Sequence, residues 1–269
     1  MLFAAWSTWP PAWSMAVGIF AACKLLTWLG TRAPPAPAWR HLAYLFAWPG
    51  LDAKAFLDTR PLPTEQRPTP GEWLFAVAKL AFGALLIWGV VPHVEPDLPR
   101  GWVGMVGLIF VLHFGSFHLV SCAWRAVGVD AKPLMAWPLL AANLGEFWGK
   151  RWNTAFRDLT HRFVFRPLTP RVGARWGIVA VFVFSGVVHD LVISLPPRGG
   201  YGLPTLYFLI QCAGLFAEKS KVGKRVGLGA GWRGRLFTAL VVAAPVYWLF
   251  HPPFVLKVVL PFLHRLGAI

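Results

Sequence analysis

The stretch RWGIVAVFVFSGVVHDLVISL, residues 175–195, decides the fold class of this chain. Almost every side chain in it is apolar, and its length matches the ~20 residues that a helix needs to cross a bilayer. Two ionisable residues, His189 and Asp190, interrupt it. Ionisable groups at this depth are costly and tend to be functional. Because histidine titrates near neutral pH, His189 is the first candidate for a general base.

Outward from this stretch, similar apolar segments recur at residues 12–30, 72–91, 102–124, 203–217 and 236–250, with a shorter one at 254–263. The chain is 57% hydrophobic and only 14% charged, whereas a soluble domain is about one quarter charged. We therefore expect one all-α domain over residues 1–269, a polytopic membrane helical bundle of about 6–8 spans. Residues 41–49 are too short to cross and end in Trp-Pro-Gly, which predicts a re-entrant or interfacial segment.

The basic residues orient this bundle. Of the 26 Lys and Arg residues, 20 lie in segments 31–71, 122–175 and 218–235, while the alternate loops carry only Arg100 and Arg198. The positive-inside rule then places these three segments in the cytoplasm and the N-terminus outside. Contact with anionic membrane lipids accounts for the net charge of +15 and makes a nucleic-acid partner unnecessary. The abundance of Arg, Ala, Gly and Pro suggests a bacterial source, hence a multi-pass protein of the inner (plasma) membrane.

Residues 143–167, NLGEFWGKRWNTAFRDLTHRFVFRP, are too charged to span and too apolar for a free loop. On an ideal helix, Trp148 and Trp152 share an apolar face, while Glu146, Asn153 and Arg157 lie on the opposite face. One interpretation is a cytoplasmic amphipathic helix lying in the interface, anchored by Trp and Arg. The other is that the polar stripe faces a ligand or the interior of the bundle.

The same region resembles a known family. Residues 146–153 (EFWGKRWN) and 165–167 (FRP), followed by 184–190 (FSGVVHD), are similar to motifs of the membrane-bound O-acyltransferase superfamily, specifically its wax synthase-like branch. Residues 46–52 resemble the Trp-Pro-Gly-x-Asp segment of that branch, and residues 113–115 its His-Phe-Gly. The resemblance runs from about residue 42 to 195, with the motif core at about 140–195. Two departures are an Asp at 190, where the family more often has Glu, and a chain shorter than plant relatives.

The resemblance implies transfer of an acyl group from a thioester, usually acyl-CoA, to a hydroxyl. A long-chain alcohol or another lipid is the favoured acceptor; a sterol or a polysaccharide hydroxyl is also compatible with the superfamily. The essential histidine of the family maps onto His189, and its partly invariant asparagine onto Asn153. Acyl-CoA would be a co-substrate, so no cofactor is expected. We expect no metal either, since His113 and His118 lack the spacing of helical metal ligands.

The chemistry of this reaction can also be argued from the residues. An alcohol needs a base as it attacks a thioester, and a neutral imidazole such as that of His189 suits this task. Asn153 could donate its amide N–H to the thioester oxygen or hold the geometry of the histidine. We expect Trp148 and Trp152 to form the wall near the thioester. Arg151 and Arg157 are candidates for the phosphates of CoA.

Two neighbours of His189 leave alternatives open. Ser185, four residues earlier on the same helix face, could orient the ring, bind the alcohol or hydrogen-bond back to its own helix. Asp190 is rotated by about 100° from His189, which argues against a Ser-His-Asp triad, and we expect it to pair with a basic residue or a water. The alternative function is a polytopic transporter that uses His189 and Asp190 as a proton relay. The sequence does not define the oligomeric state.

Overall fold

The computed structural model describes residues 8–32 and 35–269, and all the regular elements in these residues are helical. The all-α fold class is thereby confirmed. The first part of the chain forms α1 (Trp9–Leu29), α2 (Ala38–Ala47), α3 (Ala53–Leu57), α4 (Pro70–Ala84), α5 (Asp97–Ile109) and α6 (Phe117–Ala126). The second part forms α7 (Leu144–Glu146), α8 (Thr154–Thr160), α9 (Arg166–His189), α10 (Leu203–Lys219), α11 (Lys221–Val226), α12 (Gly231–Ala243), α13 (Val246–Leu249), α14 (Pro252–Phe254) and α15 (Leu260–Arg265).

Wider, π-helical turns extend or join several of these helices. They are η2 (Leu85–Val90) after α4, η4 (Phe110–Ser116) between α5 and α6, η6 (Phe147–Arg151) after α7, η7 (His161–Phe165) after α8, η8 (Asp190–Ser194) after α9 and η9 (Val255–Val259) before α15. Short 3₁₀ turns occur at η1 (Thr64–Gln66), η3 (Val91–His93) and η5 (Pro138–Leu140). Turns of the π type are frequent at functional sites, and three of them, η6, η7 and η8, lie in or next to the predicted motif core.

Four helical segments of the described residues are long and apolar enough to cross a membrane: Trp9–Leu29, Thr64–His93, Asp97–Ala126 and Thr154–Ser194. Gly231–Leu249 and Pro252–Arg265, bent by 59° at a break directly before Pro252, make a fifth if they count as one span. The chain is thus an integral membrane protein with four or five such helices in its described part. The expected six to eight spans are not reached by this criterion; α10, with 17 residues, is at the lower limit of spanning length.

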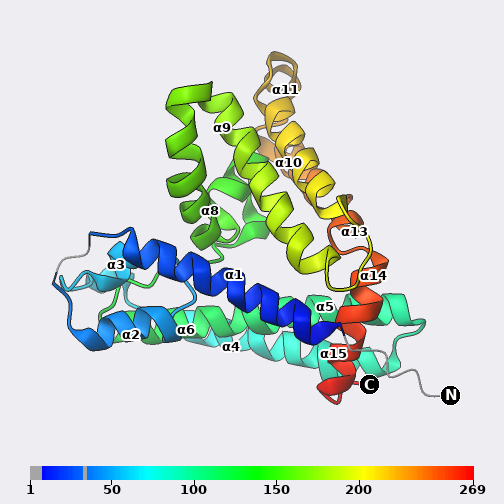
Figure 1. Cartoon of the computed structure of the whole chain (residues 1–269), viewed down its shortest axis with the longest axis horizontal. Helices are drawn as coiled ribbons and strands as arrows, with labels where there is room; N and C mark the ends of the chain where they lie inside the picture. Colours follow the sequence, from blue (N-terminus) through cyan, green and yellow to red (C-terminus); the bar gives the residue numbers. More distant parts are fainter. Residues whose placement is uncertain (1–7, 33–34) are drawn as a thin grey trace.

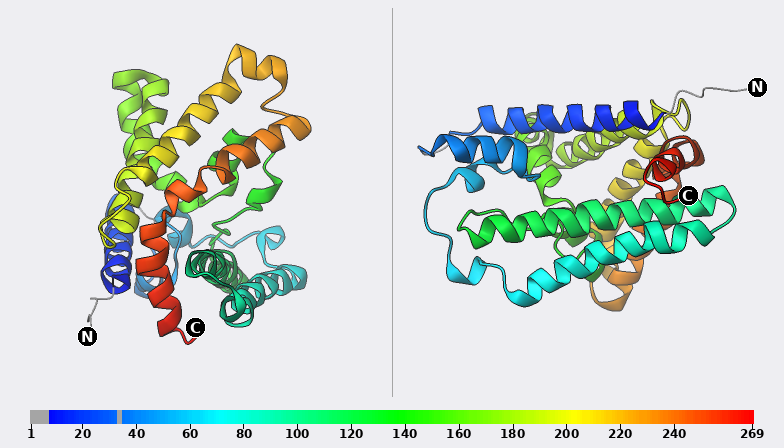
Figure 2. Two further views of the ribbon diagram at one scale, coloured as in Figure 1. Left: turned by 90° about the vertical axis from the view of Figure 1, so that its right-hand side faces the viewer. Right: turned by 90° about the horizontal axis from the view of Figure 1, so that it is seen from below.

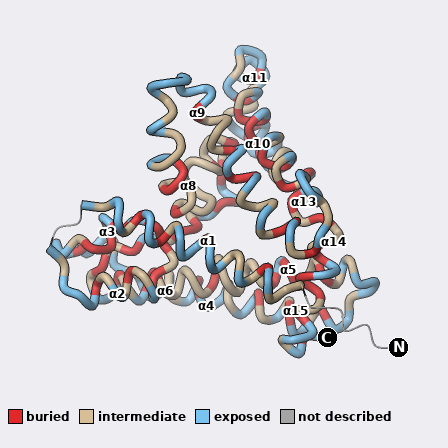
Figure 3. Tube along the Cα trace, viewed as in Figure 1, coloured by how far each residue is buried: buried red, intermediate tan, exposed pale blue. Residues whose placement is uncertain are grey.

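The elements form two layers that meet at the candidate site. Figure 1 shows α1, α4 and α6 running in a similar direction, with α8, α9 and α10 rising above them, and the views of Figure 2 show that α1 and α4 lie on opposite sides of this lower part. One apolar core joins α2, α3 and α8, and a second joins α7, α9, α10 and α13. Figure 3 shows the buried positions on α8 and α10, whereas the turn at α11 is mostly exposed. Segment 143–165 therefore passes from one core to the other.

The single amphipathic helix expected over residues 143–167 is interrupted in the structure. Trp152 has extended backbone angles, and Asn153 is left-handed with φ 39° and ψ 63°. The chain therefore turns between η6 and α8, and the expected stripe of Glu146, Asn153 and Arg157 does not form. A helical wheel cannot predict such a break, because it assumes helical angles at every residue.

Candidate active site

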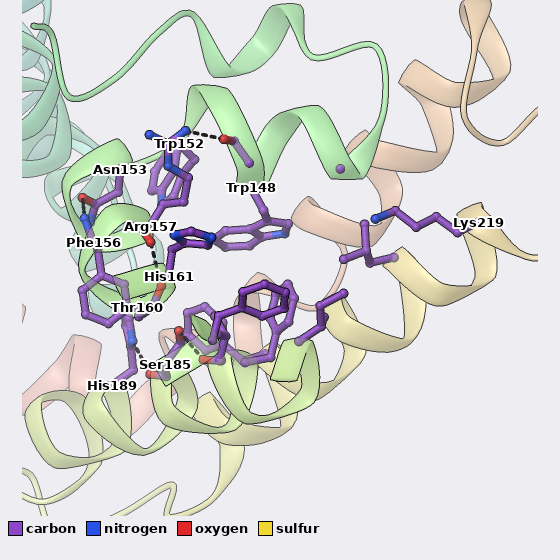
Figure 4. Close-up of a pocket in the computed structure, with 18 residues that line it drawn as sticks. Trp148, Trp152, Asn153, Phe156, Arg157, Thr160, His161, Ser185, His189 and Lys219 are labelled. Carbon is purple, nitrogen blue, oxygen red and sulfur yellow. Dashed lines mark hydrogen bonds between the residues drawn. The ribbon is translucent and has the colours of Figure 1, made fainter. Parts of the chain in front are cut away.

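A cavity of about 300 Å³ lies between segment 145–165 and the facing sides of α9 and α10. Its walls are mainly aromatic and aliphatic. Figure 4 shows side chains from α8 and the preceding turn on one side and from α9 on the other. The structure brings six of the seven predicted site residues to this cavity: Trp148, Trp152, Asn153, Arg157, Ser185 and His189. Arg151 does not line it.

His189 enters the cavity from the last turn of α9. Its Nδ1 lies 2.6 Å from the carbonyl oxygen of Ser185, one turn earlier. A carbonyl can only accept, so Nδ1 must carry the proton of this hydrogen bond. In the neutral ring, Nε2 is then the nitrogen with a lone pair. The ring is held by Phe208, at a centroid distance of 4.6 Å, and by Phe156 at 6.4 Å.

Asn153 lines the same cavity from the start of α8, on the other side of Phe156 from His189 in Figure 4. Its Oδ1 accepts a hydrogen bond from the backbone N–H of Phe156 at 3.1 Å and so caps the helix. Because the amide is planar, this bond directs the Nδ2 group away from the cap. The left-handed φ of 39° also favours asparagine, which tolerates this conformation better than most residues. The residue type therefore suits both the backbone and the site.

Trp148 forms the central wall of the cavity. Its indole Nε1 donates to Oε1 of Gln211 at 3.3 Å, and the Nε2 of Gln211 donates to the carbonyl of Val241 at 2.7 Å. The indole also packs against Phe208, at a centroid distance of 5.7 Å. Gln211 is fully buried on α10, and its two bonds fix the orientation of the tryptophan.

The two arginines predicted to bind phosphate have structural partners. Arg151 donates to Glu146 at 2.8 Å and to the carbonyls of Ala136 and Trp137 at 3.0 and 3.2 Å, which places its guanidinium outside the cavity. Arg157 lines the cavity, yet its guanidinium donates to Asp158 and to the carbonyl of Gly149 at 2.8 and 2.5 Å. Arg151 is therefore placed as a structural residue, and Arg157 as part of the wall.

Ser185 and Asp190 take positions that the sequence left open. The hydroxyl of Ser185 donates to the carbonyl of Val181 at 2.8 Å, so the back-bond forms, while its own carbonyl orients His189. Asp190 accepts from Ser194 and from the backbone at Gly202 and Thr205, at the start of α10. The sequence predicted a basic residue or a water as its partner. Among the described residues no basic side chain pairs with Asp190, because the N–H groups of a helix start are a suitable partner for a carboxylate.

Several cavity residues were missed by the sequence analysis. Phe208 and Lys219 come from α10, and His161 and Phe156 from the segment around α8. Lys219 is exposed and lies at the end of the cavity opposite Asn153 (Figure 4). The only signal for α10 was its apolar composition, which does not say which face meets α9. Lys219 and His161 leave the cavity with a basic rim.

A second cavity, of about 1250 Å³, meets the first at Trp152 and Arg157, which line both. A polar cluster lies in its wall: Nζ of Lys79 donates to Nδ1 of His118 at 2.6 Å, and Nε2 of His118 donates to Glu72 at 2.8 Å. Arg125 also binds the carboxylate of Glu72. The rest of this cavity is largely apolar.

Glu72 and His118 also form, with Cys122, a group of potential metal ligands whose atoms lie within 4.8 Å of one another. No motif in the sequence indicates this group. The cations of Lys79 and Arg125 contact the same His and Glu atoms, and their charge opposes that of a metal ion. The cluster is therefore better explained as an ion-pair network between α4 and α6.

Comparisons with known proteins agree with this geometry. Residues 131–210 match the Membrane bound O-acyl transferase family. The chain is 25% identical over 246 residues to the probable long-chain-alcohol O-fatty-acyltransferase 6 of Arabidopsis thaliana, covering 86% of this chain and 70% of the relative. It is 27% identical over 239 residues to the long-chain-alcohol O-fatty-acyltransferase of Simmondsia chinensis, covering 77% and 66%. It is 24% identical over 147 residues to acyl-CoA–sterol O-acyltransferase 1 of Arabidopsis thaliana, covering 50% and 42%.

The family match and the named relatives identify the chain as an acyltransferase that is similar to the membrane-bound O-acyltransferase superfamily. The matched segment, residues 131–210, contains both Asn153 and His189. It also contains Phe208, the residue against which the His189 ring packs. The family match thus covers all the residues that line the first cavity except Leu215 and Lys219.

Proposed function

We propose that the protein transfers a fatty acyl group from acyl-CoA to the hydroxyl of a long-chain alcohol, giving an ester and free CoA. The observation that carries this proposal is the arrangement of His189 and Asn153. The imidazole presents an unprotonated Nε2 in a cavity that also receives an amide from the start of α8. The names of the relatives support a long-chain alcohol as the acceptor. Acyl-CoA is a co-substrate, and the proposed reaction requires no cofactor or metal.

The reaction can be written with these two groups. As the alcohol oxygen attacks the thioester carbon, its proton moves to Nε2 of His189. The carbonyl oxygen becomes negative and is stabilised by the Nδ2–H of Asn153, a type of donor that contributes roughly 3–4 kcal/mol. The C–S bond then breaks, and the imidazolium returns its proton to the CoA thiolate. The apolar walls exclude water, which would otherwise hydrolyse the thioester.

The basic rim is suited to the phosphates of the donor. Lys219 is exposed and makes no ion pair among the described residues, so its ammonium group is available to a phosphate. Replacing Lys219 by Ala should raise the KM for acyl-CoA several-fold with little change in kcat, more at low salt than at high salt. Lys221→Ala is the matched control, because Lys221 is exposed on α11 but does not line the cavity. Equal KM values for the two variants would remove Lys219 from the donor site.

The two cavities together suit a long-chain acceptor. An apolar cavity of about 150 Å³ holds one benzene molecule, so the first cavity holds roughly a dozen carbon atoms. An acyl chain and a long-chain alcohol together need more room than this. The second cavity is larger and largely apolar, and it shares Trp152 and Arg157 as wall residues with the first. We place the alcohol chain there, with its hydroxyl reaching past Trp152 toward His189.

Ester synthesis by the expressed protein tests the proposal. Membranes containing the chain are incubated with labelled acyl-CoA and a panel of alcohols, including a sterol. New ester should depend on His189 and fall at least 100-fold in His189→Ala, by loss of the general base. His93→Ala, which changes an exposed histidine outside the cavities, is the control. Ester made equally well by His189→Ala, or proton-coupled uptake without any ester, would contradict the proposal.

A further inference from the structure

Asp190, the residue after the candidate base, begins a chain of hydrogen bonds that leads to two fully buried side chains. Both oxygens of Asp190 are occupied: Oδ1 accepts from Ser194 Oγ at 2.9 Å and from the N–H of Gly202 at 2.8 Å. Oδ2 accepts from the N–H of Thr205 at 3.1 Å and from its hydroxyl. The carboxylate therefore fastens the end of α9 to the start of α10. A negative charge at a helix N-terminus is also favoured by the helix dipole.

Ser194 extends this chain to the C-terminal region. Its side chain is fully buried, and Oγ lies 3.1 Å from Nε2 of His251, which is also fully buried. The backbone N–H of Phe254 donates to Nδ1 of His251 at 3.3 Å, so this nitrogen bears the lone pair. In the neutral ring, Nε2 then carries the proton and donates to Ser194. The hydroxyl proton of Ser194 is thereby left for its two acceptors, Asp190 at 2.9 Å and the carbonyl of Gly200 at 3.2 Å.

Two glycines allow the close approach that this chain needs. A Cβ on Gly200, which has φ +72°, would overlap the ring of His251. A Cβ on Gly186 would lie 2.6 Å from Cα of Thr205. Gly186, three residues before His189 on α9, and Asp190, one residue after it at the start of η8, lie where this segment meets α10. The packing that receives Asp190 at Thr205 also sets Phe208, one turn later, against the His189 ring at 4.6 Å.

We propose that Ser194 and His251, acting through Asp190, are positioning residues that hold the α9–α10 contact at which Nε2 of His189 reaches the substrate. Neither lines either cavity, so neither touches the substrates. The inference rests on the proposed acyl transfer. A misplacement of a catalytic group by about 1 Å can lower a rate on the order of 100-fold. The cluster thus contains Ser, His and Asp without being a nucleophilic triad.

Paired substitutions test this role in the full-length membrane protein. His251→Gln keeps a donor near the position of Nε2, whereas His251→Asn keeps only an acceptor near Nδ1. We expect Ser194→Ala and His251→Asn to lower kcat 10- to 100-fold with the KM for acyl-CoA within about twofold of wild type, because the donor site is untouched. His251→Gln should recover most of the lost kcat.

Thr238→Ala is the control for simple loss of a buried hydroxyl. Thr238 is buried on α12, and its Oγ1 donates to the carbonyl of Gly234 at 2.8 Å, away from the chain of Asp190. The inference is overturned if Ser194→Ala retains wild-type kcat, if Thr238→Ala loses as much, or if His251→Gln recovers nothing beyond His251→Asn. Wild-type protein that forms no ester from any alcohol would instead contradict the proposed function itself.

Discussion

At the scale of single residues, Asn153 combines two tasks that a simple alanine substitution would mix. Its Oδ1 caps α8, and its backbone occupies the left-handed region. The Nδ2 group is the part proposed to act on the thioester oxygen. Replacement by Ala would remove the cap and strain the backbone together with the amide. Two other substitutions separate these contributions.

Asn153→Asp keeps the capping oxygen and removes the amide donor, while Asn153→Gly keeps the left-handed backbone and removes the whole side chain. We expect kcat to fall about 10²–10³-fold in both, as for the loss of one oxyanion donor. The free energy of unfolding should change little for Asp and by a few tenths of a kcal/mol for Gly. The measurements are kcat with labelled acyl-CoA and thermal unfolding in detergent. A folded Asn153→Gly protein with wild-type kcat would show that the amide is not needed.

At the scale of elements, segment 143–165 shows what the sequence could and could not predict. Its resemblance to a family motif identified Trp148, Trp152 and Asn153, which all reach the cavity. The helical wheel drawn over it was wrong, because the chain turns at Asn153. The partners of Arg151 lie at residues 136, 137 and 146. Two of these contacts are backbone carbonyls in a loop, which no periodic pattern encodes.

The ion pair of Arg151 and Glu146 makes the stability of this segment depend on pH. A hydrogen bond from the N–H of Ala142 and the contact with Arg151 lower the pKa of Glu146 from its usual value. A carboxylate whose pKa is lowered by folding stabilises the fold at pH values above the pKa that it has in the unfolded chain. This contribution is lost as the pH falls through the lowered pKa of the folded state. We expect the thermal midpoint of the protein to drop more between pH 7 and pH 3 than that of Glu146→Gln.

This difference in thermal midpoint should be small, since Glu146 is accessible to solvent and its charge is screened.

A substitution of Arg151 distinguishes a structural role in this ion pair from a role in substrate binding. Arg151→Gln should lower the thermal midpoint while leaving the KM for acyl-CoA unchanged. A raised KM at unchanged stability would return Arg151 to the donor site.

The close packing of α9 on α10 predicts that a larger residue at Gly186 lowers both stability and activity. Gly186→Ala would place a methyl group 2.6 Å from Cα of Thr205, in a contact that backbone atoms cannot easily relieve. Overpacking of this kind typically costs about 1–3 kcal/mol of folding free energy. It would also move His189, so kcat should fall together with stability. Gly18→Ala on α1 is the control, since nothing lies within 4 Å of a Cβ there; equal effects of the two changes would argue against a tight α9–α10 contact.

At the scale of the whole molecule, the apolar composition predicted an all-helical membrane protein, and the charge distribution predicted its orientation. The structure confirms the first. The second stays a prediction, because the arrangement of helices does not by itself say which side is cytoplasmic. Helix α10 offers a direct test, since its 17 residues separate residue 201 from segment 218–235. A helix of this length spans roughly 25 Å.

Cysteine labelling on intact cells would decide the orientation. Tyr201, Val222 and Leu139 are 61%, 69% and 96% exposed, so a cysteine at each should react without disturbing the core. If segments 122–175 and 218–235 face the cytoplasm, an impermeant maleimide labels Tyr201→Cys in intact cells but Val222→Cys and Leu139→Cys only after permeabilisation. The native protein is the blank, because Cys122 and Cys212 are buried and Cys23 is partly buried. Labelling of Val222→Cys but not Tyr201→Cys in intact cells would invert the orientation. It would then place the basic rim at Lys219, and with it the proposed entry for acyl-CoA, on the side away from the cytoplasm.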